Sequence, residues 1–224
     1  MSQPNKKQFD SPFHIANNTA LLTACNGFKS RCLFYPSSGQ DFIEPIEKFW
    51  PFIDEFWFVD PTYRLKHSLI ANHFTWTLID TMLTTETGLT IRKNTPFKVQ
   101  IRTDIYLEES TDRKIKIHSC KGLGYNAFRV AFRNTGKSLS IFLHRGDSPG
   151  EGGSDFHWLT KKMLKYLLLH VEPNGLIVTD GSNSSVFYSE ESPTPFQLHN
   201  RKFQPIAKIE PRNGPTVVWQ ISGD

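Results

Sequence analysis

Acidic and small residues that follow short apolar runs are the ones in this chain whose type and spacing could do chemistry. The first group is Ser37, Ser38, Gly39 and Asp41, directly after an apolar run. Small residues and glycine between a strand and a helix expose backbone N–H groups, which receive anions or the polar end of a nucleotide. Asp60 ends the next apolar run, 21 residues after Gly39. A carboxylate at about this spacing holds the hydroxyls of a ribose in dinucleotide-binding proteins.

Three further carboxylates lie after later apolar runs. Asp147 and Glu151 lie in a glycine-rich loop, and Asp180 is followed by glycine at the end of another run. Asp147 and Glu151 could act as a general acid and base, bind a divalent ion or hold a ribose. Because the carboxyl ends of parallel strands meet at one edge of a sheet, we expect Asp60, Asp147 and Asp180 to converge on one crevice.

A purely structural interpretation of these residues also stays open. Gly39 fits a turn, Asp60 fits the end of a strand, and Asp147 and Glu151 fit turn and capping positions. Asp41 with Glu44 fits a capping box at the start of a helix. The eight histidines and three cysteines show no metal-ligand spacing, so we predict no metal site from them.

Alternating apolar patterns predict the elements that must position these residues. Strands are expected at 31–36, 56–60, 97–108, 114–118, 125–134, 138–144, 176–179, 202–210 and 215–222. Helices are expected at 18–28, from Asp41 towards Pro51, at 67–84 and around 156–170, the last followed by a tight Pro-Asn-Gly turn. Strands followed by helices favour a sheet covered on both faces. We therefore predict an α/β Rossmann-like three-layer sandwich, mostly parallel, with a C-terminal antiparallel hairpin and an inserted β-meander.

Length and composition favour one domain over residues 1–224, because 224 residues with 38% hydrophobic content suffice for one sizeable core. Residues 1–12 are expected to form a flexible arm. No apolar run approaches the ~20 residues of a membrane helix, so no membrane contact is predicted. The three cysteines, odd in number, favour a reduced cytoplasmic location, where they would act as small buried apolar groups.

The positive charge of the chain is concentrated in one segment. Residues 92–137 contain 11 Lys and Arg against 4 Asp and Glu, whereas the rest contains 15 against 18. A basic segment on a mildly acidic body favours a polyanionic partner, and we expect nucleic acid to contact the Arg92–Lys137 region. A solvated strand face would explain the same charges.

Parts of the chain resemble the class I S-adenosylmethionine-dependent methyltransferases. The helix, Pro-Asn-Gly and apolar strand at 164–180 look like that family's Leu-Lys-Pro-Gly-Gly-apolar unit before its fifth strand. The hairpin at 202–222 is similar to the family's final antiparallel pair, and 33–60 resembles its first βαβ unit. The resemblance implies Gly39 in the glycine-loop position and Asp60 in the ribose position. The family's leading acid and two of its loop glycines are missing here.

Three functions follow as expectations. The first is a divergent methyltransferase-like protein that binds S-adenosylmethionine or a related nucleoside, with Asp147 and Glu151 near the transfer site. The second is a non-enzymatic module on the same fold that holds nucleic acid or a protein through residues 92–137. The third is a nucleotide-handling hydrolase that uses Asp147, Glu151 and a divalent ion.

Overall fold

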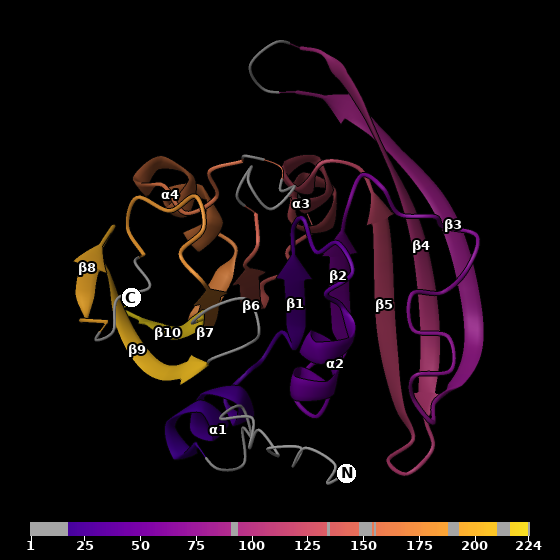
Figure 1. The fold of residues 1–224 in the computed structure, drawn as a ribbon, viewed down its shortest axis with the longest axis horizontal. Helices are drawn as coiled ribbons and strands as arrows, with labels where there is room; N and C mark the ends of the chain where they lie inside the picture. The colour runs from indigo at the N-terminus through magenta and orange to yellow at the C-terminus, as the bar shows by residue number, and fades with distance from the viewer. Residues whose placement is uncertain are drawn as a thin grey trace, which may run out of the picture.

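A single ten-stranded mixed sheet organises the molecule (Figure 1). The computed structural model describes residues 18–90, 94–133, 135–147, 154, 156–187, 193–209 and 216–223. Strand order across the sheet is β3-β4-β5-β2-β1-β6-β7-β10-β9-β8. The expected arm at 1–12 lies outside the described residues.

Five parallel strands form the centre of the sheet. They are β1 (Cys32–Tyr35), β2 (Glu55–Val59), β5 (Arg113–Lys121), β6 (Leu139–His144) and β7 (Val171–Thr179). Neighbours among them pair in parallel. Numbered along the chain, the parallel strands lie in the order third, second, first, fourth, fifth. The chain therefore builds outwards from β1, first in one direction and then in the other.

Antiparallel strands flank this centre on both sides. On one side lie β3 (Thr77–Leu89) and β4 (Pro96–Glu108), and β4 pairs with β5. On the other side β10 (Thr216–Ser222) pairs with both β7 and β9 (Arg201–Ile209), and β8 (Phe196–Leu198) forms the edge. The C-terminal antiparallel hairpin predicted from the sequence is confirmed.

Four helices within the described residues cover the two faces of the sheet. The face that carries Leu33 and Tyr35 packs against α1 (Thr19–Asn26) and α2 (Ile43–Phe49). The opposite face packs against α3 (Gly124–Phe132) and α4 (Lys161–Leu168). Because both faces are covered, β1, β2 and β6 are mainly apolar, and all four residues of β1 are buried.

Two segments adopt a secondary structure other than the predicted one. The helix expected at 67–84 is wrong, because β3 begins at Thr77. Five threonines in β3 favour an extended backbone, since a side chain branched at Cβ is restricted in a helix. The strand expected at 125–134 is also wrong, because this segment forms α3. Phe128 and Phe132 are one helical turn apart and both are buried against the sheet.

The segment expected as an inserted meander, residues 92–137, belongs to the main sheet. It supplies β4 and β5, and β5 is the third parallel strand beside β2. The connection from β2 to β5 therefore contains the β3–β4 hairpin in place of a crossover helix. Figure 1 shows β3 and β4 along one side of the molecule, with their paired ends projecting beyond the neighbouring strand ends.

The Pro-Asn-Gly unit lies inside β7 instead of preceding it. Leu139 of β6 is opposite Val171, and Ile141 is opposite Leu176, so two steps along β6 face five along β7. Asn174 has a φ of 65°, which asparagine tolerates better than most residues. The segment is therefore a bulge in the strand.

Strand β3 is an exposed edge. All of its residues except Gly88 are exposed, and Leu83 retains 65% of its accessible surface. The strand contains no lysine and no proline, and only Asp80 and Glu86 carry charge. Edge strands in native proteins are commonly protected by such residues.

The cysteines predicted to be buried are buried and free, at positions 25, 32 and 120. Burial raises the pKa of Cys25 to about 12, so its thiol is protonated and behaves as a small apolar group. Among the described residues, no helix is long and apolar enough to cross a membrane.

The start of α3 packs closely against the end of β1. A Cβ placed on Gly124 would lie 2.8 Å from Cβ of Pro36, too close for two carbon atoms. We expect Gly124→Ala to lower the free energy of unfolding by about 1–3 kcal/mol, because α3 must shift to relieve the overlap. Urea unfolding measures the change. Leu123→Ala is the control, because Leu123 is exposed, and an equal loss in both variants would contradict the packing argument.

Candidate functional site

The carboxyl ends of four parallel strands lie side by side, as the sequence predicts. Tyr35, Val59, Leu143 and Val178 are at or near the ends of β1, β2, β6 and β7, and these strands are consecutive in the order β2-β1-β6-β7. The loops that follow them contain the predicted site residues. Hydrogen bonds between those loops determine which of the polar groups remain available to a ligand.

Asp60 joins the loops that follow β1 and β2. Its Oδ2 accepts a hydrogen bond from the Gly39 N–H at 3.2 Å, and its Oδ1 accepts one from the Thr62 N–H at 2.7 Å. Gly39 has a φ of 52°, a conformation that glycine adopts without strain. Gly39 and Asp60, which the sequence predicts to serve one ligand site, are therefore in direct contact. In this structure the Asp60 carboxylate binds backbone N–H groups of the two loops.

Ser37 and Ser38 have different roles in the first loop. Ser37 has a φ of 52° and is partly exposed, so it forms the turn. Ser38 is buried, donates its N–H to the Val59 carbonyl at 3.0 Å, and lies with its Oγ 2.5 Å from the Tyr63 hydroxyl oxygen. Burial raises the pKa of Tyr63, so this hydroxyl is neutral. Ser38 thus fastens the loop to the end of β2.

An ion-pair cluster lies between the ends of β1 and β6. Arg145 donates Nε and Nη2 to the two oxygens of Asp41, at 2.7 and 2.8 Å, and Nη2 also to Glu44 at 2.6 Å. Tyr35 donates its hydroxyl to Asp41 at 2.7 Å. Burial raises the pKa of Tyr35, and the adjacent Asp41 carboxylate raises it further. A two-pronged arginine–carboxylate pair is among the stronger polar contacts in proteins.

The capping box predicted for Asp41 and Glu44 is wrong. Helix α2 begins at Ile43 with Phe42 at its N-cap, and no side chain bonds the cap. Asp41 instead accepts hydrogen bonds from Arg145 and Tyr35. Leaving the largely buried Arg145 guanidinium without a counter-charge would cost more free energy than leaving the end of α2 without a side-chain cap. Glu44 points to the same guanidinium.

Asp147 is fully buried and holds its own loop together. Its carboxylate accepts hydrogen bonds from the Ser154 N–H and, at 3.0 Å, from the Ser154 hydroxyl, and its Oδ2 lies 3.3 Å from His144 Nε2. Burial acts to raise the pKa of Asp147, but the contacts with His144 and Ser154 outweigh it and lower the pKa. Its predicted partner Glu151 lies outside the described residues, so the acid–base role of the pair stays a prediction.

Asp180 joins the loops that follow β6 and β7. Its Oδ2 accepts the Gly146 N–H at 2.7 Å, and its Oδ1 accepts the Ser182 N–H at 2.8 Å. Asn183 donates its amide to the Asp147 carbonyl. The loops after β6 and β7 are therefore bonded in the same way as those after β1 and β2.

Asp147 and Asp180 follow the adjacent strands β6 and β7, whereas Asp60 follows β2 on the other side of β1, and each of the three carboxylates has a separate set of partners. Asp60 and Asp180 are half-buried and face backbone N–H groups, whereas Asp147 is enclosed. No group of three His, Cys, Asp or Glu among the described residues could hold a metal ion.

Sequence reasoning missed Arg145 and Tyr35. Arg145 directly follows a predicted strand, but its partners Asp41 and Glu44 lie more than a hundred positions earlier. Nothing in the local pattern indicates such a pair. A strand tyrosine is ordinarily an apolar core residue, so Tyr35 gave no signal either.

Comparison of the chain with models of known protein families, with curated proteins and with solved structures finds no match.

We expect Asp147→Asn to reduce the free energy of unfolding by about 2 kcal/mol at pH 7, because charge-assisted hydrogen bonds are lost from a buried site. The folded state lowers the pKa of Asp147, so its contribution is complete above the ordinary carboxyl pKa of about 3.9 and is lost as the pH falls below it. The difference between variant and parent should therefore shrink on acidification. Urea unfolding at pH 7 and at pH 3 tests this.

The matched control is Asp80→Asn, which removes an exposed carboxylate from β3. It should change stability little at either pH. A loss for Asp147→Asn that is the same at pH 3 and pH 7 would show that the carboxylate charge is not what stabilises the loop.

Proposed function

We propose that this protein is a Rossmann-like α/β protein that binds a nucleoside-type ligand at the carboxyl ends of β1, β2 and β6, with S-adenosylmethionine as the first candidate. The observation that carries the proposal is the order of the parallel strands. The parallel strands lie in the order β5-β2-β1-β6-β7, which is the strand order of doubly wound folds. Such folds bind ligands where the strand order reverses. Here the reversal lies between β1 and β6.

The space available at this reversal is defined by its neighbours. On the side of α2, the space just beyond the ends of β1 and β6 is filled by Arg145 and its partners Asp41 and Tyr35. Outside the strand ends, a Cβ placed on Gly39 or on Gly146 would meet no atom within 4 Å. A ligand would therefore lie over these two glycines, against exposed backbone.

The polar groups around the two glycines suit a ribose. Asp60 is half-buried beside Gly39, and each carboxylate oxygen can accept more than one hydrogen bond. Its bond to the Gly39 N–H therefore leaves acceptor capacity for a hydroxyl group. Asp180 offers the same arrangement beside Gly146. Ser37, Ser38 and Asp41 would shape the loop beneath the ligand.

S-adenosylmethionine is the first candidate because the sequence resembles class I methyltransferases, and the strand order supports that resemblance. Methyl transfer depends mainly on alignment of the acceptor with the sulfonium, and it needs little acid–base chemistry. A buried Asp147 is compatible with this reaction class, in which it would position the loop after β6. Because Asp147 is fully buried, its carboxylate is closed to a hydrated divalent ion, which argues against the alternative of metal-dependent hydrolysis.

Titration calorimetry with S-adenosylmethionine and S-adenosylhomocysteine tests the proposal. We expect saturable binding, and we expect Asp60→Asn to weaken it at least about tenfold, because a charged acceptor for the ribose hydroxyls is lost. Asp80→Asn is the control for the same chemical change on an exposed strand. The melting temperature of each variant shows whether the loop has kept its fold.

The absence of heat with both ligands at millimolar concentration would remove S-adenosylmethionine from the proposal. Adenosine that binds as tightly as either ligand, with the same dependence on Asp60, would keep the nucleoside site and exclude the methionine moiety as a determinant. Binding that is unaffected by Asp60→Asn would contradict the site itself.

A further inference from the structure

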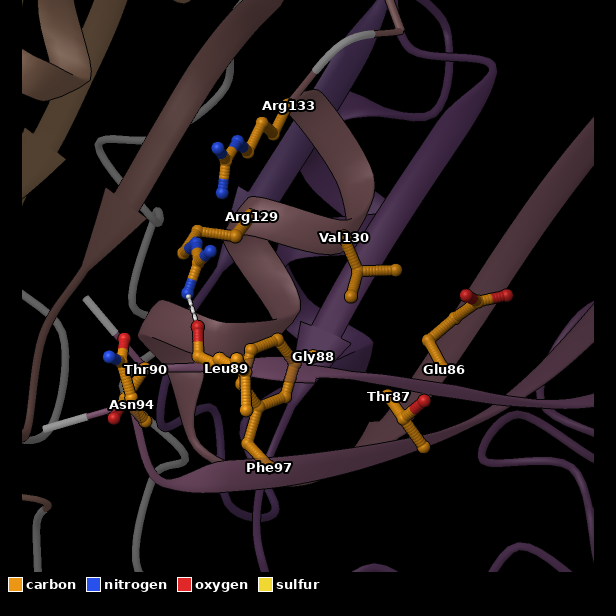
Figure 2. Close-up of a pocket in the computed structure, with 10 residues that line it drawn as sticks. All are labelled: Glu86, Thr87, Gly88, Leu89, Thr90, Asn94, Phe97, Arg129, Val130 and Arg133. Carbon is orange, nitrogen blue, oxygen red and sulfur yellow. Dashed lines mark hydrogen bonds between the residues drawn. The ribbon is translucent and has the colours of Figure 1, made fainter.

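A groove separates the end of the β3–β4 hairpin from α3. It has a volume of about 770 Å³, in the range of small-molecule sites. Figure 2 shows its lining, with the hairpin on one side and the exposed side of α3 on the other. The residues are Glu86, Thr87, Gly88, Leu89, Thr90, Asn94, Phe97, Arg129, Val130 and Arg133.

Arg129 is held in a fixed position in this groove. It is about nine-tenths buried, donates Nη1 to the Leu89 carbonyl at 2.7 Å and lies over the ring of Phe97 at 5.4 Å. Its Nε is buried and has no hydrogen-bond partner. A guanidinium that is buried without a carboxylate is costly, because the charge has lost water and gained no counter-charge.

Arg133 lies one helical turn beyond Arg129 and is exposed. In Figure 2 its guanidinium extends towards that of Arg129, over the same groove. Within the described part of the chain, no carboxylate lies in ion-pair distance of either guanidinium. The single acidic residue in the lining is Glu86 on β3.

Because no carboxylate among the described residues neutralises Arg129 and Arg133, the charge of this groove favours an anionic ligand. Like charges on adjacent turns repel each other, and an anion between them removes that cost. The planar guanidinium fork matches the oxygens of a phosphate group, and the apolar side chains of Leu89, Val130 and Phe97 suit a ring beside it.

We infer that the groove between the β3–β4 hairpin and α3 is a binding site for a phosphate ester of nucleotide type, in which Arg129 and Arg133 contact the phosphate. The phosphate ester is either a free nucleotide or one unit of a nucleic-acid strand. This inference does not depend on the nucleoside site proposed above, because the groove contains none of that site's residues. It gives the basic segment Arg92–Lys137 a defined point of contact.

The test measures binding of adenosine monophosphate, adenosine, inorganic phosphate and a short single-stranded oligonucleotide to the whole protein by calorimetry. We expect adenosine monophosphate to bind more tightly than adenosine through contacts that depend on the arginines. Arg133→Gln should weaken binding of adenosine monophosphate by about tenfold and remove its advantage over adenosine. Because Arg133 is exposed, the melting temperature of this variant should stay close to that of the parent.

Two further variants separate a local effect from a general loss of positive charge. Arg64→Gln removes one exposed positive charge between Tyr63 and Leu65, which pack on the opposite face of the sheet, and it should leave binding unchanged. Thr87→Glu places a carboxylate on the exposed lining of the groove without altering either arginine, and it should weaken phosphate binding as Arg133→Gln does.

The oligonucleotide distinguishes the two sources of the phosphate. Tighter binding than adenosine monophosphate, with a steep loss as salt is raised, would identify a nucleic-acid strand, because binding then releases counterions. Equal or weaker binding would identify a free nucleotide. Equal affinity for adenosine and adenosine monophosphate, or an equal effect of Arg133→Gln and Arg64→Gln, would overturn the inference. Asp60→Asn, which acts on the nucleoside site, should leave the advantage of adenosine monophosphate over adenosine intact.

Discussion

Burial of the central strands on both faces is the constraint on which the rest of this structure depends. Helices α1 and α2 cover one face and α3 and α4 the other, so β1 is filled with apolar side chains from end to end. Few polar groups can lie within such a strand. Most polar groups are therefore pushed to the strand ends, where backbone N–H groups also lack partners. The acidic residues Asp60, Asp147 and Asp180 accordingly lie just beyond the carboxyl ends of β2, β6 and β7.

The carboxylates at this edge first satisfy the protein's own backbone. Asp60 and Asp180 each close a loop by accepting a glycine N–H from the neighbouring loop, and Asp41 is taken by Arg145. Each of these contacts joins two loops that follow different strands. The same contacts narrow the room at the reversal of strand order, so a ligand there would rest on backbone more than on side chains.

The sequence predicted β1, β2, β6 and the second half of β7, because these buried parallel strands are short apolar runs bounded by small residues, but it assigned β5 to an inserted meander. It also predicted that Gly39 and Asp60 belong together, since their spacing follows from one βαβ unit. It failed where tertiary context decides. The threonine-rich segment 77–89 forms a strand because it pairs with β4. Residues 124–132 form a helix because a helix places Phe128 and Phe132 on the same buried face. Arg145 and Asp41 meet only after the whole sheet has formed, so no local pattern announces them.

The open edge at β3 has a consequence for how the molecule behaves in a crowded solution. Within the described ranges β3 pairs with β4 alone, so the N–H and C=O groups along its other side can pair with another extended chain. The exposed side chains on the same strand include Leu78, Met82 and Leu83. The strand has no lysine whose charge would oppose pairing with another strand. The described sheet thus has two edge strands of unequal length, three residues in β8 and thirteen in β3, so β3 offers the longer row of backbone groups to an added strand.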